Sequence, residues 1–242
     1  MKRSNIHIGT SGWHYDHWIG RFYPEDIDKP DMLDYYCHEF ETAEINNSFY
    51  QLPDRDTLRK WRDAAPDNFI FSVKGSRYIT HMKKLNDPEQ SGEKLFEAIE
   101  ALGDNIGPVL FQLPPRWHFN AERLEQFLGV LPKNYKYALE FRDRTWLCDE
   151  AYEILERHGA AFCMYHLEGF ETDKIVTAGH IYIRLHGPGA AYEGEYDKSY
   201  LSGWAGAISA WSDSGKEIYI YFDNDQNAYA AKDAAKLKSM FV

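Results

Sequence analysis

The sequence alternates about eight short apolar segments with stretches that have the periodicity of amphipathic helices. Strands that regularly alternate with helices form parallel sheets. The 242 residues of the chain are close to the roughly 250 typical of a (β/α)8 barrel. We therefore predict one TIM-like (β/α)8 barrel domain over residues 1–242. The expected strands are Ile6–Thr10, Thr42–Asn46, Phe69–Lys74, Val109–Leu113, Tyr137–Arg142, Ala161–Tyr165, His180 to the turn at Gly187, and Glu217–Asp223.

Local signals place the helices between these strands. Asp54 and Asn120 are good N-caps, and Gly159 follows the last residue of a periodic segment. Only a short polar segment separates the sixth and seventh strands, so the helix there is expected to be reduced to a turn. A doubly wound open sheet is the alternative fold, but the turn after the first strand lacks a GxGxxG motif. The other helices are expected at Pro30–Phe40, Glu89–Gly103, Ser199–Trp211 and Ala228–Phe241.

Charge and cysteine content narrow the class of protein. The formal net charge of −11 disfavours a nucleic-acid binder with an overall basic surface, although the loop from Arg77 to Lys84 is locally basic. Three cysteines without CxxC spacing argue against a disulfide framework or a zinc–cysteine site. The first residues lack the apolar core of a signal peptide, and no apolar run is long enough to span a membrane. We expect a cytoplasmic protein without a membrane partner; no sequence feature specifies an oligomeric state.

A row of polar residues follows the strands on the face opposite their apolar side chains, and it is densest where the strands end. A charged group inside a barrel costs several kcal/mol unless it is paired. Two interpretations remain open, and they can hold for different members of the row. One is a structural ion-pair network, and the other is a site at the C-terminal face, where barrel enzymes have their active sites. The row consists of Ser11, Glu44, Asn46, Ser72, Lys74, Gln112, Glu140, Arg142, Arg184, His186 and Asp223.

The spacing within the row indicates candidate chemistry. Glu140 and Arg142 lie two apart on one strand face, which suits a general acid or base beside an anion clamp. Arg184 and His186 repeat this spacing, and His186 could move protons or only hydrogen-bond to a carboxylate. Lys74 could form a Schiff base, bind a phosphate or form a salt bridge.

These considerations give a predicted site. The candidate catalytic residues are Glu140, His186 and Asp223. The candidate ligand-binding residues are Trp13, Asn46, Lys74, Gln112, Arg142, Arg184 and Asn224. A metal site from Glu140, His166, His186 and Asp223 lacks HxH or HExxH spacing, so we predict neither a metal nor another cofactor. The aromatic residues of the first two loops, which include Trp18 and Tyr50, could stack on sugars or bases or plug the top of the barrel.

An ordered set of short motifs runs through nearly the whole chain. They are Ile8–Trp13, Asn46–Tyr50, Val73-Lys74, Thr80-His81, Phe111–Pro115, Glu140–Arg142, Arg184–Gly187 and Tyr221–Asn224. Together they resemble the DUF72 (YecE-like) family. The resemblance implies a TIM-barrel-like fold but does not define a reaction. The family's barrel has been likened to the xylose-isomerase and endonuclease-IV group, which is an analogy of fold only.

The main functional hypothesis is a barrel enzyme, of hydrolase, isomerase or lyase type, that acts on a small anionic, polyhydroxylated ligand such as a phosphosugar or nucleotide fragment. Arg142, Arg184 and Lys74 would bind the anion, and Glu140 would move protons with His186 or Asp223. One alternative is a phosphodiester hydrolase or nucleic-acid binder that uses the basic loop. The other is a ligand-binding protein without catalytic activity.

Overall fold

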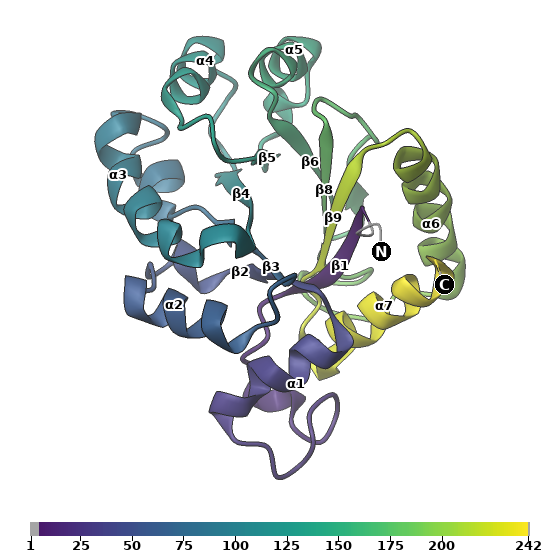
Figure 1. The fold of residues 1–242 in the computed structure, drawn as a ribbon. Helices are drawn as coiled ribbons and strands as arrows, with labels where there is room; N and C mark the ends of the chain where they lie inside the picture. The colour runs from purple at the N-terminus through teal and green to yellow at the C-terminus, as the bar shows by residue number, and fades with distance from the viewer. Residues whose placement is uncertain (1–4, 242) are drawn as a thin grey trace.

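Eight parallel strands close into a barrel in the computed structural model, which describes residues 5–241 (Figure 1). Each strand pairs with the next along the chain, and the last one returns to pair with β1. The predicted TIM-like barrel is confirmed. Residues 1–4, part of the stretch from which we expected no signal peptide, lie outside the described residues. The barrel strands are β1 (Ile6–Ser11), β2 (Thr42–Ile45), β3 (Ile70–Lys74), β4 (Ile106–Leu113), β5 (Tyr137–Phe141), β6 (Ala161–Leu167), β8 (His180–Leu185) and β9 (Glu217–Phe222).

The helices surround the strands (Figure 1). Asp54 and Asn120 act as the predicted N-caps, since their side chains accept hydrogen bonds from the backbone amides of Thr57 and Arg123. Gly159 ends its helix in the left-handed conformation. Within residues 5–241, no helix is both long and apolar enough to cross a bilayer. The helices are α1 (Met32–Glu39), α2 (Arg55–Ala64), α3 (Pro88–Ile99), α4 (Ala121–Val130), α5 (Asp149–His158), α6 (Lys198–Asp213) and α7 (Tyr229–Lys238).

Three segments refine the predicted elements. The reduced connection after β6 contains β7 (Phe170–Glu171), which pairs antiparallel with β6. β4 begins three residues before the predicted strand and includes Gly107. An added Cβ atom at Gly107 would lie only 2.7 Å from a side-chain carbon of Ile70. The long loop after β3 contains one π-helical turn at Tyr78–Met82.

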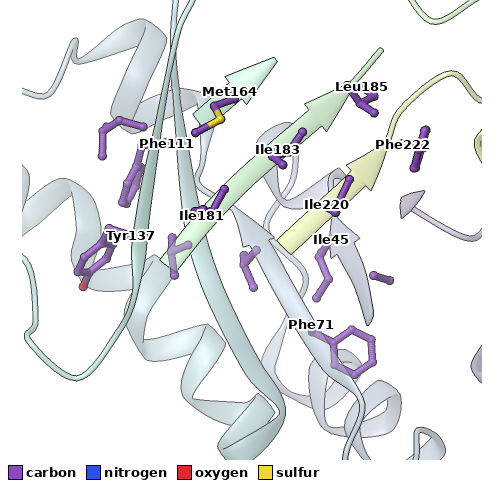
Figure 2. Close-up of a cluster of buried hydrophobic side chains, with 14 of the residues drawn as sticks. Ile45, Phe71, Phe111, Tyr137, Met164, Ile181, Ile183, Leu185, Ile220 and Phe222 are labelled. Carbon is purple, nitrogen blue, oxygen red and sulfur yellow. The ribbon is translucent and has the colours of Figure 1, made fainter. Parts of the chain in front are cut away.

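The apolar core has two parts, one outside and one inside the barrel. Ile181, Ile183 and Leu185 follow one side of β8 and belong to the outer layer that packs against the helices (Figure 2). The inner part is small and includes Tyr182, Tyr219 and Tyr221. The hydroxyl of Tyr221 is 2.7 Å from the hydroxyls of both Thr42 and Ser72. The inner side chains are Leu110, Ala138, Ala161, Cys163, Ala178, Tyr182, Tyr219 and Tyr221.

Candidate functional site

Arg184 lies inside the barrel, where its guanidinium meets three carboxylates from three other strands. Its Nη2 atom is 2.7 Å from Glu44 Oε1 and 2.8 Å from Asp223 Oδ2, and its Nη1 atom is 3.0 Å from Glu140 Oε2. Ser11 accepts a further bond at 3.1 Å. The Arg184 side chain is 0% exposed, so a ligand has no access to it. The predicted ion-pair network therefore exists, with Arg184 at its centre.

Glu140 is enclosed between two arginines. Arg142 Nε donates to Glu140 Oε1, while Arg184 Nη1 donates to Oε2. Burial alone would raise the pKa of Glu140, but the two guanidiniums outweigh it and hold the pKa well below its usual range. Glu140 has no exposed surface. The expectation that Glu140 transfers protons to a ligand does not fit this arrangement, because the carboxylate stays ionised and out of reach.

His186 is buried beside the same arginines. Its Nε2 atom lies 3.0 Å from Arg142 Nη2 and 3.3 Å from Arg184 Nη1. Guanidinium groups only donate, so Nε2 must be the unprotonated nitrogen and Nδ1 carries the hydrogen. Nδ1 is 3.0 Å from Asp223 Oδ2, without the geometry of a hydrogen bond. Burial, Arg184 and Arg142 lower the pKa of His186 well below its usual range, so the ring is neutral.

Asp223 and His186 thus lie side by side as a buried wall of the barrel interior. Burial raises the pKa of Asp223, although Arg184 and Lys74 act in the opposite direction. Tyr192 covers this wall from the loop after β8, and its ring packs edge-on against His186 at 5.6 Å. Neither Asp223 nor His186 therefore faces open solvent, which argues against a direct catalytic role for the pair in this conformation.

Lys74 differs from the other cations of the network because its ammonium is unpaired. Its side chain is buried at the end of β3, and among residues 5–241 no carboxylate or hydrogen-bond acceptor contacts Nζ. Nζ instead lies 4.5 Å from the centre of the Phe49 ring. Burial and the charge of Arg184 lower the pKa of Lys74 to about 8, against the opposing effect of Glu140 and the other carboxylates.

Three polar groups accompany Lys74 at the C-terminal face. Gln112 lies opposite Glu140 in the β4–β5 register and is partly exposed. Asn46 is also partly exposed, but its Oδ1 atom is buried without a partner. His81 stands edge-on to the Phe49 ring at 5.0 Å, and burial together with nearby cations lowers its pKa to about 4. Our site prediction omitted His81, although the long basic loop and the Thr80-His81 motif both pointed to it.

A cavity of about 300 Å³ opens beside this group, between the loops after β1 and β2 and helix α2. Trp13 and Trp61 meet edge to face in its wall at 5.1 Å. Our site prediction did not include Trp61, which lies on helix α2. Trp18, by contrast, is fully buried in the outer core, where its indole nitrogen donates to the Asp225 carbonyl at 2.8 Å. The principal lining residues are Trp13, His14, Tyr15, Asn46, Tyr50 and Trp61.

Asn224 is a further predicted residue that does not fit the structure, and His166, which we did not predict as a metal ligand, has another partner. Asn224 was expected to bind ligand, but its side-chain amide donates to the Gly194 carbonyl and to Asp233. It therefore ties the loop after β8 to helix α7. His166, considered as a metal ligand, is hydrogen-bonded through Nδ1 to the Tyr196 hydroxyl at 2.9 Å. In the described part of the chain, no group of three or more His, Cys, Asp or Glu side chains is arranged to hold a metal ion.

The model of the family described as "Protein of unknown function DUF72" matches residues 7–242. The chain belongs to the DUF72 family. The Bacillus subtilis UPF0759 protein YunF is 23% identical, over 96% of this chain and 93% of its own length. The Escherichia coli (strain K12) UPF0759 protein YecE is 27% identical over 57% of this chain and 48% of its own length.

Solved structures agree with this assignment. A DUF72 family protein from Thermotoga maritima superposes with a TM-score of 0.89 at 28% identity, with 98% of both chains covered. A DUF72 family protein from Enterococcus faecalis gives a TM-score of 0.74 at 17% identity, over 98% of this chain and 97% of the other, and shows the shared fold. The family has no assigned activity in its description, so the site itself must support a proposal.

Proposed function

We propose that this protein is an enzyme that binds a small anionic, polyhydroxylated compound, such as a phosphosugar, at the C-terminal face of the barrel. The unpaired ammonium of Lys74 is the observation that carries the proposal. An isolated buried cation is unfavourable unless another group compensates its lost hydration. An anionic group of a ligand would supply that compensation, because charge-assisted hydrogen bonds are stronger than neutral ones.

Arg142 supports the same ligand chemistry. Its Nε and Nη2 atoms are engaged by Glu140 and His186, whereas its Nη1 atom makes no hydrogen bond to residues 5–241. The side chain is 9% exposed, unlike that of the enclosed Arg184. Arg142 can therefore donate to a carboxylate or phosphate while it remains anchored to the network.

The neighbouring cavity supports a ligand with hydroxyl groups. Its volume of about 300 Å³ is at the lower end of the roughly 300–1,000 Å³ typical of small-molecule pockets. The indole ring of Trp61, which is partly exposed in the cavity wall, offers a surface on which a sugar ring can pack. The Oδ1 atom of Asn46 is buried without a partner, so a small shift of this partly exposed side chain would let it accept a hydrogen bond from a ligand hydroxyl.

Sulfate is a suitable first probe, because it remains doubly charged throughout the pH range in which Lys74 titrates. Calorimetry at pH 7 should show sulfate binding to the wild-type protein and at least a tenfold loss of affinity, about 1.4 kcal/mol, in Lys74→Met and in Arg142→Gln. The affinity of the wild-type protein should fall as the pH rises through about 8, since Lys74 then loses its positive charge. Lys60→Met, on an exposed helix surface, is the matched control and should bind as the wild type does.

Equal sulfate affinity in the wild type and Lys74→Met would refute the anion site. Phosphosugars should displace sulfate from the wild-type protein, with Asn46→Ala weakening them more than it weakens sulfate. Displacement by a short oligonucleotide at low salt, but by no phosphosugar, would instead favour the phosphodiester-directed alternative.

A further inference from the structure

We propose that Lys74 is a nucleophile that forms an imine with the carbonyl carbon of its ligand. The substrate class would then be small aldehydes or ketones that carry a carboxylate or phosphate group. This inference rests on the proposed anion site, in which Arg142 would hold the charged group while the carbonyl carbon approaches Nζ.

The placement of the amine is the first support. The side chain is only 6% exposed, and the Ser48 hydroxyl fixes the backbone by donating to the Lys74 carbonyl at 2.6 Å. Phe49 flanks the ammonium. Nζ therefore occupies a defined position at the edge of the barrel interior, and no neighbouring side chain in residues 5–241 competes for its lone pair.

The second support is that the buried carboxylates are paired with Arg184 and not with Lys74. Glu44, Glu140 and Asp223 all direct carboxylate oxygens at Arg184, which leaves none of them in contact with Lys74. A lysine that served only to neutralise the network would form an ion pair with one of them. Lys236 illustrates that arrangement, since its ammonium contacts both Glu195 and Asp233.

The protonation state of Lys74 suits a nucleophile. With a pKa of about 8, roughly one amine in ten is neutral at pH 7. For a lysine with the ordinary value of 10.5, the neutral fraction is roughly 300-fold smaller. Desolvation of an amine near another cation is an established way to activate a lysine, and Arg184 is the cation here.

The reaction balances without an oxidant or reductant. The neutral amine attacks the carbonyl carbon, a C–N bond forms, and the carbonyl oxygen takes a proton to give a carbinolamine. The C–O bond then breaks, and one water molecule leaves with a second proton. In sum, a Lys74 ammonium and a carbonyl compound give a protonated imine and water. The product keeps the positive charge, so the nearby carboxylates that favour charged Lys74 also favour the iminium.

Reductive trapping tests the inference directly. The full-length protein is incubated at pH 7 with pyruvate and sodium cyanoborohydride, which reduces an iminium to a stable secondary amine, and the labelled lysines are identified by peptide mass spectrometry. We expect Lys74 to be labelled about 100-fold faster than the exposed Lys29 and Lys60. Acetone, which lacks an anionic group, should label Lys74 much more slowly than pyruvate.

The controls separate this inference from the anion site. Lys74→Arg removes the amine and should lose the fast-labelled peptide, whereas Lys60→Met should be labelled at Lys74 as fast as the wild type. If wild-type protein binds sulfate but labels Lys74 no faster than Lys29, the imine is refuted and the anion site stands. If wild-type protein neither binds sulfate nor labels Lys74, both proposals fail. Site mapping on the wild type decides these outcomes even if a variant fails to fold.

Discussion

Lys74→Met should change how the stability of the barrel depends on pH. Methionine has a similar length but no charge, so the variant removes the titrating group and keeps most of the packing. The fall in the pKa of Lys74 from 10.5 to about 8 on folding corresponds to about 3 kcal/mol, at about 1.4 kcal/mol per pH unit. The folded state binds this proton more weakly than the unfolded chain does. The destabilisation is therefore complete below pH 8 and is relieved as the pH rises toward 10.5.

The assay is urea unfolding of both proteins at intervals from pH 7 to pH 9.5. Between these limits the wild type should gain about 2 kcal/mol of unfolding free energy relative to Lys74→Met. Tyrosine ionisation in the unfolded chains is common to both proteins and cancels in the difference. If the difference in unfolding free energy between the two proteins is constant with pH, folding does not lower the pKa of Lys74. If the wild type instead loses stability relative to the variant as the pH rises, folding raises the pKa of Lys74, because the nearby carboxylates outweigh burial.

Three further substitutions test other parts of the structure. Arg184→Met should prevent folding or lower the free energy of unfolding by more than about 4 kcal/mol, because it leaves buried carboxylates uncompensated. A thermal melt like that of the wild type would refute the central role of this residue. Arg184→Lys should not restore the lost stability. Tyr221→Phe should cost about 1–3 kcal/mol in urea unfolding, since two buried hydroxyls lose a partner, and an unchanged midpoint would contradict this. Gly187→Ala should destabilise the loop after β8, because φ is +105° and the new Cβ would lie 2.1 Å from the Glu193 carbonyl oxygen; faster proteolysis of that loop is the measurement, and unaltered proteolysis would argue against it.

The alternation of apolar strands with amphipathic helices, together with the chain length, was enough to predict the barrel, and period-two alternation within the strands placed the polar row inside it. In β8, for example, Ile183 faces the helices and Arg184 faces the interior, as the pattern requires. The pattern could not show which polar residues neutralise one another. Glu140 is the last residue but one of β5, and Lys74 is the last residue of β3. Both carry charge, yet Glu140 is enclosed between arginines and Lys74 is unpaired. That difference depends on distances between strands remote in sequence.

The cavity was harder to predict for a related reason. Trp61 has the spacing of a core residue on α2, and only the docking of that helix beside the first loop brings it against Trp13. Asn224 shows the opposite error, because we predicted it to bind ligand from its position after the end of β9, but its amide donates to Asp233. His81 could have been selected from its position in a long loop.

The contacts of Arg184 also determine when the barrel can close during folding. Glu44 lies 140 positions before Arg184, and Glu140 lies 44 positions before Arg184. Asp223 lies 39 positions after Arg184. Until β8 is in place, Glu44 has no guanidinium partner and Glu140 has only Arg142. We therefore expect that the first six strands do not enclose a dry interior alone. The last quarter of the chain completes the charge balance, so we expect the closed interior to form cooperatively and late.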